Sequence, residues 1–222
     1  MNSATRIVTK QNWGAVRATA SVFGIYAGIL GVEHGIFEVL QGNAVPKSIR
    51  IMAVSGPGLP FPFGHEPAMT VIPNFLATGI CAILVGLSIV LWSTVLVHGK
   101  HGAVVLSLLS VLLLLVGGGF GPISLLIVAC IGASKIDKPL IWWKTHLPRR
   151  LCHCLALVWM WSFTAALLWV PGEFVLGQIF HLENDQHKTL TNLNLMLSYP
   201  MLFLFALTLI AAFAYHIENR SE

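Results

Sequence analysis

Three ionisable side chains lie inside the first long apolar stretch of the chain, which runs from Ala18 to Leu40. They are Glu33, His34 and Glu38. Ionisable groups at membrane depth are costly and usually mark a function. Because His34 and Glu38 are four residues apart, they share one face of a helix and can meet one ligand, proton or metal ion together. Glu33 points about 100° away from His34 and would serve a different face.

A second set of chemically capable side chains follows in a loop of unusual composition. The loop from Ser55 to Ala68 holds His65 and Glu66, and three prolines and three glycines before Pro67 forbid a helix there. Its two phenylalanines favour a lid that packs onto the helices. The alternative is an ordered loop without a ligand.

Two kinds of site can be built from these residues. With the lid folded over the helix, four ligands of the types that zinc, manganese or iron takes come together, so a divalent metal is one candidate cofactor. That metal set is His34, Glu38, His65 and Glu66. Without the loop, His34 and Glu38 form either the proton or cation site of a carrier or a buried ion pair that locks the helix to its neighbours.

Further polar residues occur at the ends of later apolar segments. The Asn74 amide either completes a ligand- or proton-binding pocket or caps the helix that begins after Pro73, and capping is the favoured role. Glu173 ends the fifth apolar segment, on the side of the membrane where the first segment ends, and is a further candidate binding residue. Cys152-His153-Cys154 is an incomplete metal set, so a structural role is favoured there.

The composition excludes a soluble protein. Of the 222 residues, 56% are hydrophobic and 10% are charged, with a mean hydropathy of +0.79, whereas soluble domains carry about 25% charged residues. The chain has room for about five or six membrane helices of roughly 20 residues and little else. We therefore expect an all-α polytopic helical membrane bundle, a single integral membrane domain over residues 1–222. No basic run is interleaved with aromatic residues, which leaves membrane lipids rather than nucleic acid as partners.

The uncharged runs predict where the helices lie. The third run, Ala103 to Ala133, would be roughly 45 Å long as one helix, well beyond a hydrocarbon core of about 30 Å. Its middle, Gly117 to Pro122, contains four glycines and a proline, which favours either two short helices or one kinked helix. With a break there, the predicted segments cover about residues 15–40, 71–97, 102–118, 122–134, 153–175 and 193–215.

The distribution of lysines and arginines distinguishes an unbroken third run from one that turns back. With an unbroken third run, the lysines and arginines divide five against eight between the two sides, whereas a hairpin at Gly117 to Pro122 divides them ten against three. Short loops rich in Lys and Arg stay in the cytoplasm. We therefore predict six segments in the cell membrane, with both termini cytoplasmic. The candidate site then faces outward.

Three stretches carry a resemblance to a group of known proteins. Gly31 to Asn43, Asn74-Phe75-Leu76 and the turn Gly117 to Pro122 resemble uncharacterised small multi-pass membrane proteins of bacteria and archaea. The resemblance spans about the first two thirds of the chain. It implies no activity, but it implies that the three stretches form one unit.

Functions from different classes follow from these patterns. The first is a small permease or ion- or proton-coupled carrier with an outward-facing His/Glu site, which at this chain length calls for a homo-oligomer. The second is a membrane-embedded metal-dependent enzyme at the outer surface. The third is an accessory or structural membrane subunit whose polar residues serve helix packing. Stoichiometric metal in the purified protein would favour the enzyme.

Overall fold

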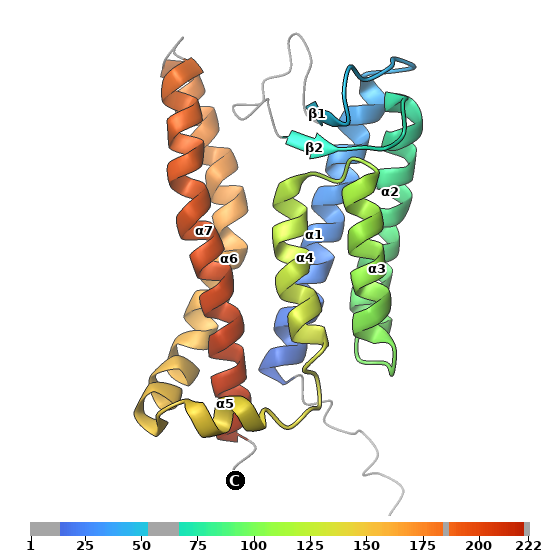
Figure 1. Cartoon of the computed structure of the whole chain (residues 1–222). Helices are drawn as coiled ribbons and strands as arrows, with labels where there is room; N and C mark the ends of the chain where they lie inside the picture. The colour runs from blue at the N-terminus through green and yellow to red at the C-terminus, as the bar shows by residue number, and fades with distance from the viewer. Residues whose placement is uncertain (1–13, 53–66, 184–186, 220–222) are drawn as a thin grey trace, which may run out of the picture.

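The computed structural model describes residues 14–52, 67–183 and 187–219, except for the side chains of residues 170, 173, 174, 176–183 and 187–198. In chain order these residues form α1 (Ala15–Leu40), β1 (Arg50–Met52), β2 (Pro67–Met69), α2 (Phe75–Leu91) with a π-helical turn η2 (Trp92–Leu96), α3 (Gly102–Leu115), α4 (Phe120–Ala133), α5 (Ile141–His146), α6 (Arg149–Glu183) and α7 (His187–Asn219). The long helices run up and down along one axis, and α5 lies across their lower end (Figure 1).

The helices have the length and composition of membrane spans. Four of the described helices are long and apolar enough to cross a membrane, namely Ala15–Leu40, Phe75–Leu96, Arg149–Trp169 and Tyr199–Asn219, and α3 and α4 are shorter apolar helices beside them. Large apolar side chains such as Leu84, Leu108 and Phe203 are exposed on their outward faces, which is typical of surfaces that contact lipid. The protein is therefore mostly helical, multi-pass and integral to a membrane.

The third apolar run forms two helices, which confirms the predicted break. α3 ends at Leu115 and α4 begins at Phe120, and each is 14 residues long, about 21 Å. Between them, Gly117 and Gly119 have φ angles of 95° and 77°, a conformation that is open to glycine and rare for other residues. The turn from Val116 to Gly119 is buried. Protein therefore covers the point at which the chain reverses.

α1 is the central helix of the bundle, and α2 packs on it through glycines of both helices. Gly28 faces Gly86 and Gly35 faces Gly79, and a Cβ atom at Gly35 would lie 2.7 Å from the carbonyl oxygen of Gly79. In each helix the two glycines are seven residues apart, so they return to the same face after two turns. The two backbones are in direct contact, as in other small-residue interfaces between membrane helices.

α6 and α7 form a long antiparallel pair beside α1 and α4 (Figure 1). The ring of Phe23 in α1 has centroid distances of 6.0 Å to Phe163 and 5.5 Å to Phe205. A hydrogen bond from Trp159 Nε1 to Thr19 Oγ1, at 3.2 Å, accompanies these rings. At the level of Phe23, aromatic side chains thus join this pair to α1.

A two-stranded antiparallel sheet at the upper end is a feature that the all-α expectation missed. β1 pairs with β2, with Ile51 opposite Ala68. Gly117 N donates to Met69 O at the end of β2, and Val71 N donates to Leu115 O, both at 2.9 Å. These backbone bonds attach the end of β2 and the segment after it to the end of α3 and the turn that follows. They do not depend on an alternating side-chain pattern, so the sequence gives little signal for them.

The described basic residues separate between the two ends of the bundle. By the order of the helices, the lower end carries Arg17, Lys100, Lys135, Lys138, Lys144, Arg149 and Arg150, whereas the upper end carries Lys47, Arg50 and the position of Lys188. α1 begins and α7 ends at the lower end (Figure 1). This is the division that a hairpin at Gly117 to Pro122 was predicted to produce.

Candidate functional site

His34 and Glu38 lie one turn apart near the upper end of α1, and both are buried. The exposed fraction is 3% for His34 and 0% for Glu38. Glu38 is among the largest side chains that the fold encloses completely. The helix thus places both groups inside the protein rather than toward lipid. Polar groups of membrane helices normally face the interior of the protein in this way.

The turn between α3 and α4, here called the glycine turn (Val116 to Gly119), lies directly against these two side chains. A Cβ atom at Gly117 would be 2.5 Å from Oε2 of Glu38, and one at Gly119 would be 2.6 Å from Nε2 of His34. Real side chains do not approach so closely. Glycine is therefore required at both positions twice over, by the positive φ angles and by the absence of space.

The carboxyl group of Glu38 is fully enclosed by the protein. Within the part of the chain that the structure describes, neither of its oxygens has a hydrogen-bond partner. His34, the partner that the sequence offers for a buried ion pair, makes no hydrogen bond to either of these oxygens. A buried polar group without a partner costs about 1–3 kcal/mol, and a buried unpaired charge costs more.

The amino terminus of α4 contributes a positive electrostatic potential to the site. α4 begins at Phe120, directly after Gly119, so its positive end lies beside the polar pair. A helix end stabilises a nearby anion by about 0.3–1 kcal/mol, and by about 2 kcal/mol in partly buried geometries. This falls short of the several kcal/mol that desolvation of a carboxylate costs. The dipole alone therefore does not compensate an ionised Glu38.

Two buried threonines, which the sequence did not single out, form the wall behind the glycine turn. Thr78 Oγ1 donates to Val116 O at 2.8 Å, and Thr70 and Thr78 share a hydrogen bond of 2.5 Å between their hydroxyls. Both side chains are buried. Thr78 precedes Gly79, which contacts α1, and Val116 precedes Gly117, which contacts Glu38. The hydroxyls thus fix the turn that covers the carboxyl.

Glu33 belongs to another face of α1, as its position next to His34 predicts. It is half-buried and lies seven residues from Tyr26, hence on the same side of the helix. The Tyr26 hydroxyl donates to Leu167 O of α6 at 3.4 Å. Glu33 is therefore on the side of α1 that faces α6 and α7, away from the glycine turn.

Asn74 caps α2, which confirms the role favoured from the sequence. Its Oδ1 accepts from Ala77 N at 2.9 Å, and its Nδ2 donates to Asn43 Oδ1. The amide thereby ties the chain after α1 to the start of α2. Both of its hydrogen-bonding atoms serve this local structure.

The structure does not test the predicted metal set, because two of its four residues lie outside the described part of the chain. Across residues 14–52, 67–183 and 187–219, no group of three or more His, Cys, Asp or Glu side chains is placed to hold a metal ion. His65 and Glu66, and the lid to which they belong, lie outside the described residues, as does the side chain of Glu173. The part of this set on which the structure bears is His34 and Glu38.

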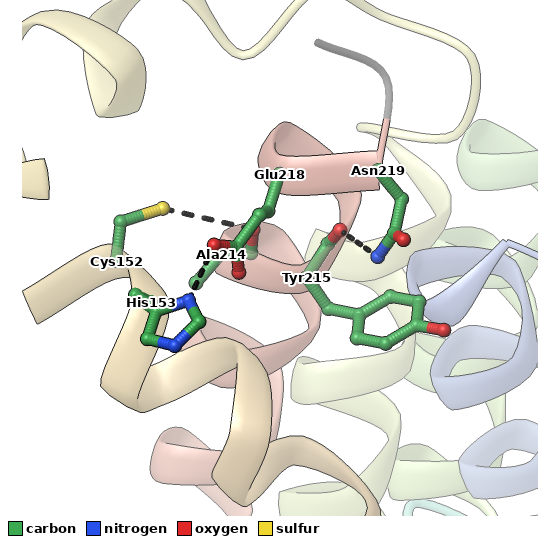
Figure 2. Close-up of polar contacts among 6 residues, drawn as sticks. All are labelled: Cys152, His153, Ala214, Tyr215, Glu218 and Asn219. Atoms are coloured by element: carbon green, nitrogen blue, oxygen red, sulfur yellow. Dashed lines mark hydrogen bonds and ion pairs between the residues drawn. The ribbon is translucent and has the colours of Figure 1, made fainter. Parts of the chain in front are cut away.

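The Cys-His-Cys tripeptide joins two helices at the lower end of the bundle. His153 Nδ1 and Glu218 Oε1 are 2.6 Å apart, and the Cys152 thiol donates to Ala214 O at 3.7 Å (Figure 2). Cys154 is exposed. These contacts connect α6 with α7, in agreement with the structural role expected for the tripeptide.

Searches against protein-family models, curated proteins and solved structures find no match to this chain. The resemblance drawn from the sequence stays a prediction, and the helices support its multi-pass membrane character. Function is therefore inferred from the site itself.

Proposed function

We propose that the protein is a small ion- or proton-coupled permease in which Glu38 takes up the coupling ion. The observation that carries the proposal is the Glu38 carboxyl group, fully buried and without a hydrogen-bond partner in the described part of the chain. An ionised carboxylate in such surroundings needs a compensating charge. The side chain is placed to bind a proton or a small cation that supplies it.

A purely structural role accounts less well for this carboxyl. A buried ion pair needs a donor, and none of the described residues donates to Glu38. An apolar residue of similar volume would fill the space under the glycine turn at lower cost. Ionisable residues inside membrane segments are by default candidates for ion or proton handling.

The helices next to Glu38 also favour ion coupling. α3 ends and α4 begins at the glycine turn, which lies against His34 and Glu38. In secondary transporters the carboxyl-terminal ends of short helices help to coordinate cations, and the end of α3 is placed for that role beside Glu38.

We place the site on the outer side of the cell membrane, with both termini cytoplasmic, because the lower end carries most of the described basic residues. Single cysteines at Lys47 and Lys144, in a variant that lacks the four native cysteines, test this orientation. An impermeant thiol reagent added to intact cells should label the cysteine at position 47 and spare the one at 144. The reverse pattern would invert the orientation.

Infrared pH-difference spectra of the purified protein test the role of Glu38 directly. A buried carboxylic acid gives a C=O stretching band that changes when the group loses its proton, and we expect this band to be absent in Glu38→Gln. Glu218→Gln is the matched control, since the Glu218 side chain is 40% exposed at the opposite end and should leave the band unchanged. Titration with alkali-metal chlorides, with choline chloride as the control salt, tests whether a small cation competes with the proton for Glu38.

Glu38→Met separates ion handling from packing. We expect this variant to gain thermal stability, on the order of 1–3 kcal/mol, because it removes a buried polar group without a partner. It should also lose the response of stability to pH and cations. A loss of stability would favour a structural carboxyl. If Glu38→Gln keeps the full pH and cation response of the unmodified protein, the proposal is wrong.

A further inference from the structure

A pocket of about 220 Å³ lies at the lower end of the bundle, where the chain passes from α4 to α5. Its walls include Lys135, Lys138, Leu140, Trp142 and Trp143. Because the glycine turn is at the upper end (Figure 1), this pocket is separate from the site around Glu38.

One side of α5 is held by the bundle, and the other side is exposed. Leu140 is buried, and the ring of Trp143 packs on Phe213 of α7 with centroids 5.4 Å apart. Ile141 and Trp142, in contrast, are 65% and 61% exposed. A helix that lies across the end of a membrane bundle with Trp and Ile exposed is placed to insert them at the level of the lipid headgroups.

The chain around the pocket is strongly basic. Residues 135–150 contain five of the 13 lysines and arginines and a single acidic residue, Asp137. Lys135 and Lys138 contribute directly to the pocket walls. Basic residues clustered at a membrane surface attract anionic lipid headgroups, and a pocket gives such a headgroup a defined place to bind.

We propose that this pocket binds the phosphate group of an anionic phospholipid, with Lys135 and Lys138 contacting the phosphate oxygens. Trp142 lies beside the headgroup, as tryptophans at membrane interfaces commonly do. Ile127 and Ile131 are exposed one turn apart on α4, on the way to the pocket, so an acyl chain can lie along them. The apolar surface of Ile127 and Ile131 favours a lipid over free phosphate, which has no acyl chain to place there.

Native mass spectrometry of the purified protein with added lipid tests the proposal. Phosphatidylglycerol should bind more tightly than phosphatidylcholine, and Lys135→Gln with Lys138→Gln should weaken that binding by roughly thirtyfold, the effect expected from two lysines at an anionic surface. The control pair, Lys47→Gln with Arg50→Gln, makes the same charge change at the upper end. It should leave the affinity for phosphatidylglycerol unchanged.

Two further measurements identify the ligand and allow for misfolding. Lys135→Arg with Lys138→Arg keeps both charges and should retain phosphatidylglycerol binding. Inorganic phosphate at millimolar concentration should compete weakly or not at all. Equal affinity of the unmodified protein for the two lipids would overturn the proposal whatever the variants do, and so would equal losses in the two Gln pairs. Complete displacement by phosphate would assign the pocket to a soluble anion instead.

Discussion

α1 meets its two sets of neighbours in opposite ways. Toward α2, glycines bring the backbones together, and a Cβ atom at Gly79 would lie 2.5 Å from the carbonyl oxygen of Gly35 and 2.7 Å from the amide nitrogen of Val39. Toward α6 and α7, aromatic rings fill the space, with Phe23 against Phe163 and Phe205. Backbone contact has no rotamers through which it can adjust, whereas packed side chains can repack.

This difference determines which interface positions the polar site. Gly35 and Val39 directly follow His34 and Glu38 in the sequence, so contact with α2 fixes the turn of α1 that carries them. Phe23 is 15 residues before Glu38, about 22 Å along the helix. The glycine interface should therefore control the site, and the aromatic interface should hold α6 and α7 without controlling it.

The largest effect is expected where the backbones touch. Gly79→Ala places a methyl group against the backbone of α1, and the two helices must separate to accommodate it. We expect a loss of about 3 kcal/mol, at the upper end of the usual cost of overpacking. Unfolding in a detergent titration measures the loss, and the infrared band of Glu38 should shift because the helix that carries it moves.

Gly172→Ala is the matched control for this substitution. Gly172 lies in α6, and no heavy atom of the described residues is within 4 Å of the place where its Cβ would be. There alanine should be neutral or stabilising by up to about 1 kcal/mol, because alanine favours the helical conformation more than glycine does. A similar loss at both positions would mean that Gly79 is sensitive as a helix residue and not as a contact.

A smaller effect is expected at the glycine turn. Gly117→Ala combines a backbone conformation that costs an L residue about 1–2 kcal/mol with a contact to the Glu38 carboxyl. In a double-mutant cycle with Glu38→Ala, the contact is relieved while the backbone cost remains. The combined loss should therefore be at least about 0.5 kcal/mol smaller than the sum of the single losses.

Gly121→Ala provides the control within the same connection. Gly121 lies in the first turn of α4, and its Cβ position has no heavy atom of the described residues within 4 Å. We expect this variant to be as stable as the unmodified protein and to show no coupling with Glu38→Ala. Strictly additive losses for Gly117→Ala and Glu38→Ala would remove the argument that the turn covers the carboxyl.

The helices and the broken run could be predicted because they depend on residue type alone. Hydropathy marks membrane segments, and consecutive glycines before a proline interrupt them. The ends of the helices are harder to predict. α6 continues through Pro171 to Glu183, and α7 runs through Pro200, and the predicted membrane segments 153–175 and 193–215 lie within these two helices. Membrane helices tolerate proline, so it does not mark their ends reliably.

The site could be predicted only in part. His34 and Glu38 stand out because ionisable residues are rare in apolar stretches, but their contact with the glycine turn depends on the rotation of α1, α3 and α4 about their axes. Sequence periodicity does not determine that rotation when a helix is apolar on all sides. Thr78 was missed because a threonine in a membrane helix can satisfy its hydroxyl on its own backbone and carries no signal of a site. Thr70 follows β2 outside the helices, and its contact with Thr78 depends on how that segment packs on α2.

The smallest effect is expected at the aromatic interface, and it gives the sharpest test of the comparison. Phe23→Leu is a hydrophobic replacement in a fully buried position, for which the cost is usually below about 1.5 kcal/mol because neighbouring side chains repack. We expect a loss of about 1 kcal/mol from the ring contacts with Phe163 and Phe205. The infrared band of Glu38 should stay where it is in the unmodified protein. If Phe23→Leu shifts the band as far as Gly79→Ala does, the aromatic interface also positions the carboxyl, and the distinction between the two interfaces fails. An unchanged band in Phe23→Leu beside a shifted band in Gly79→Ala would establish that the glycines of α1 and α2 hold the polar site in place.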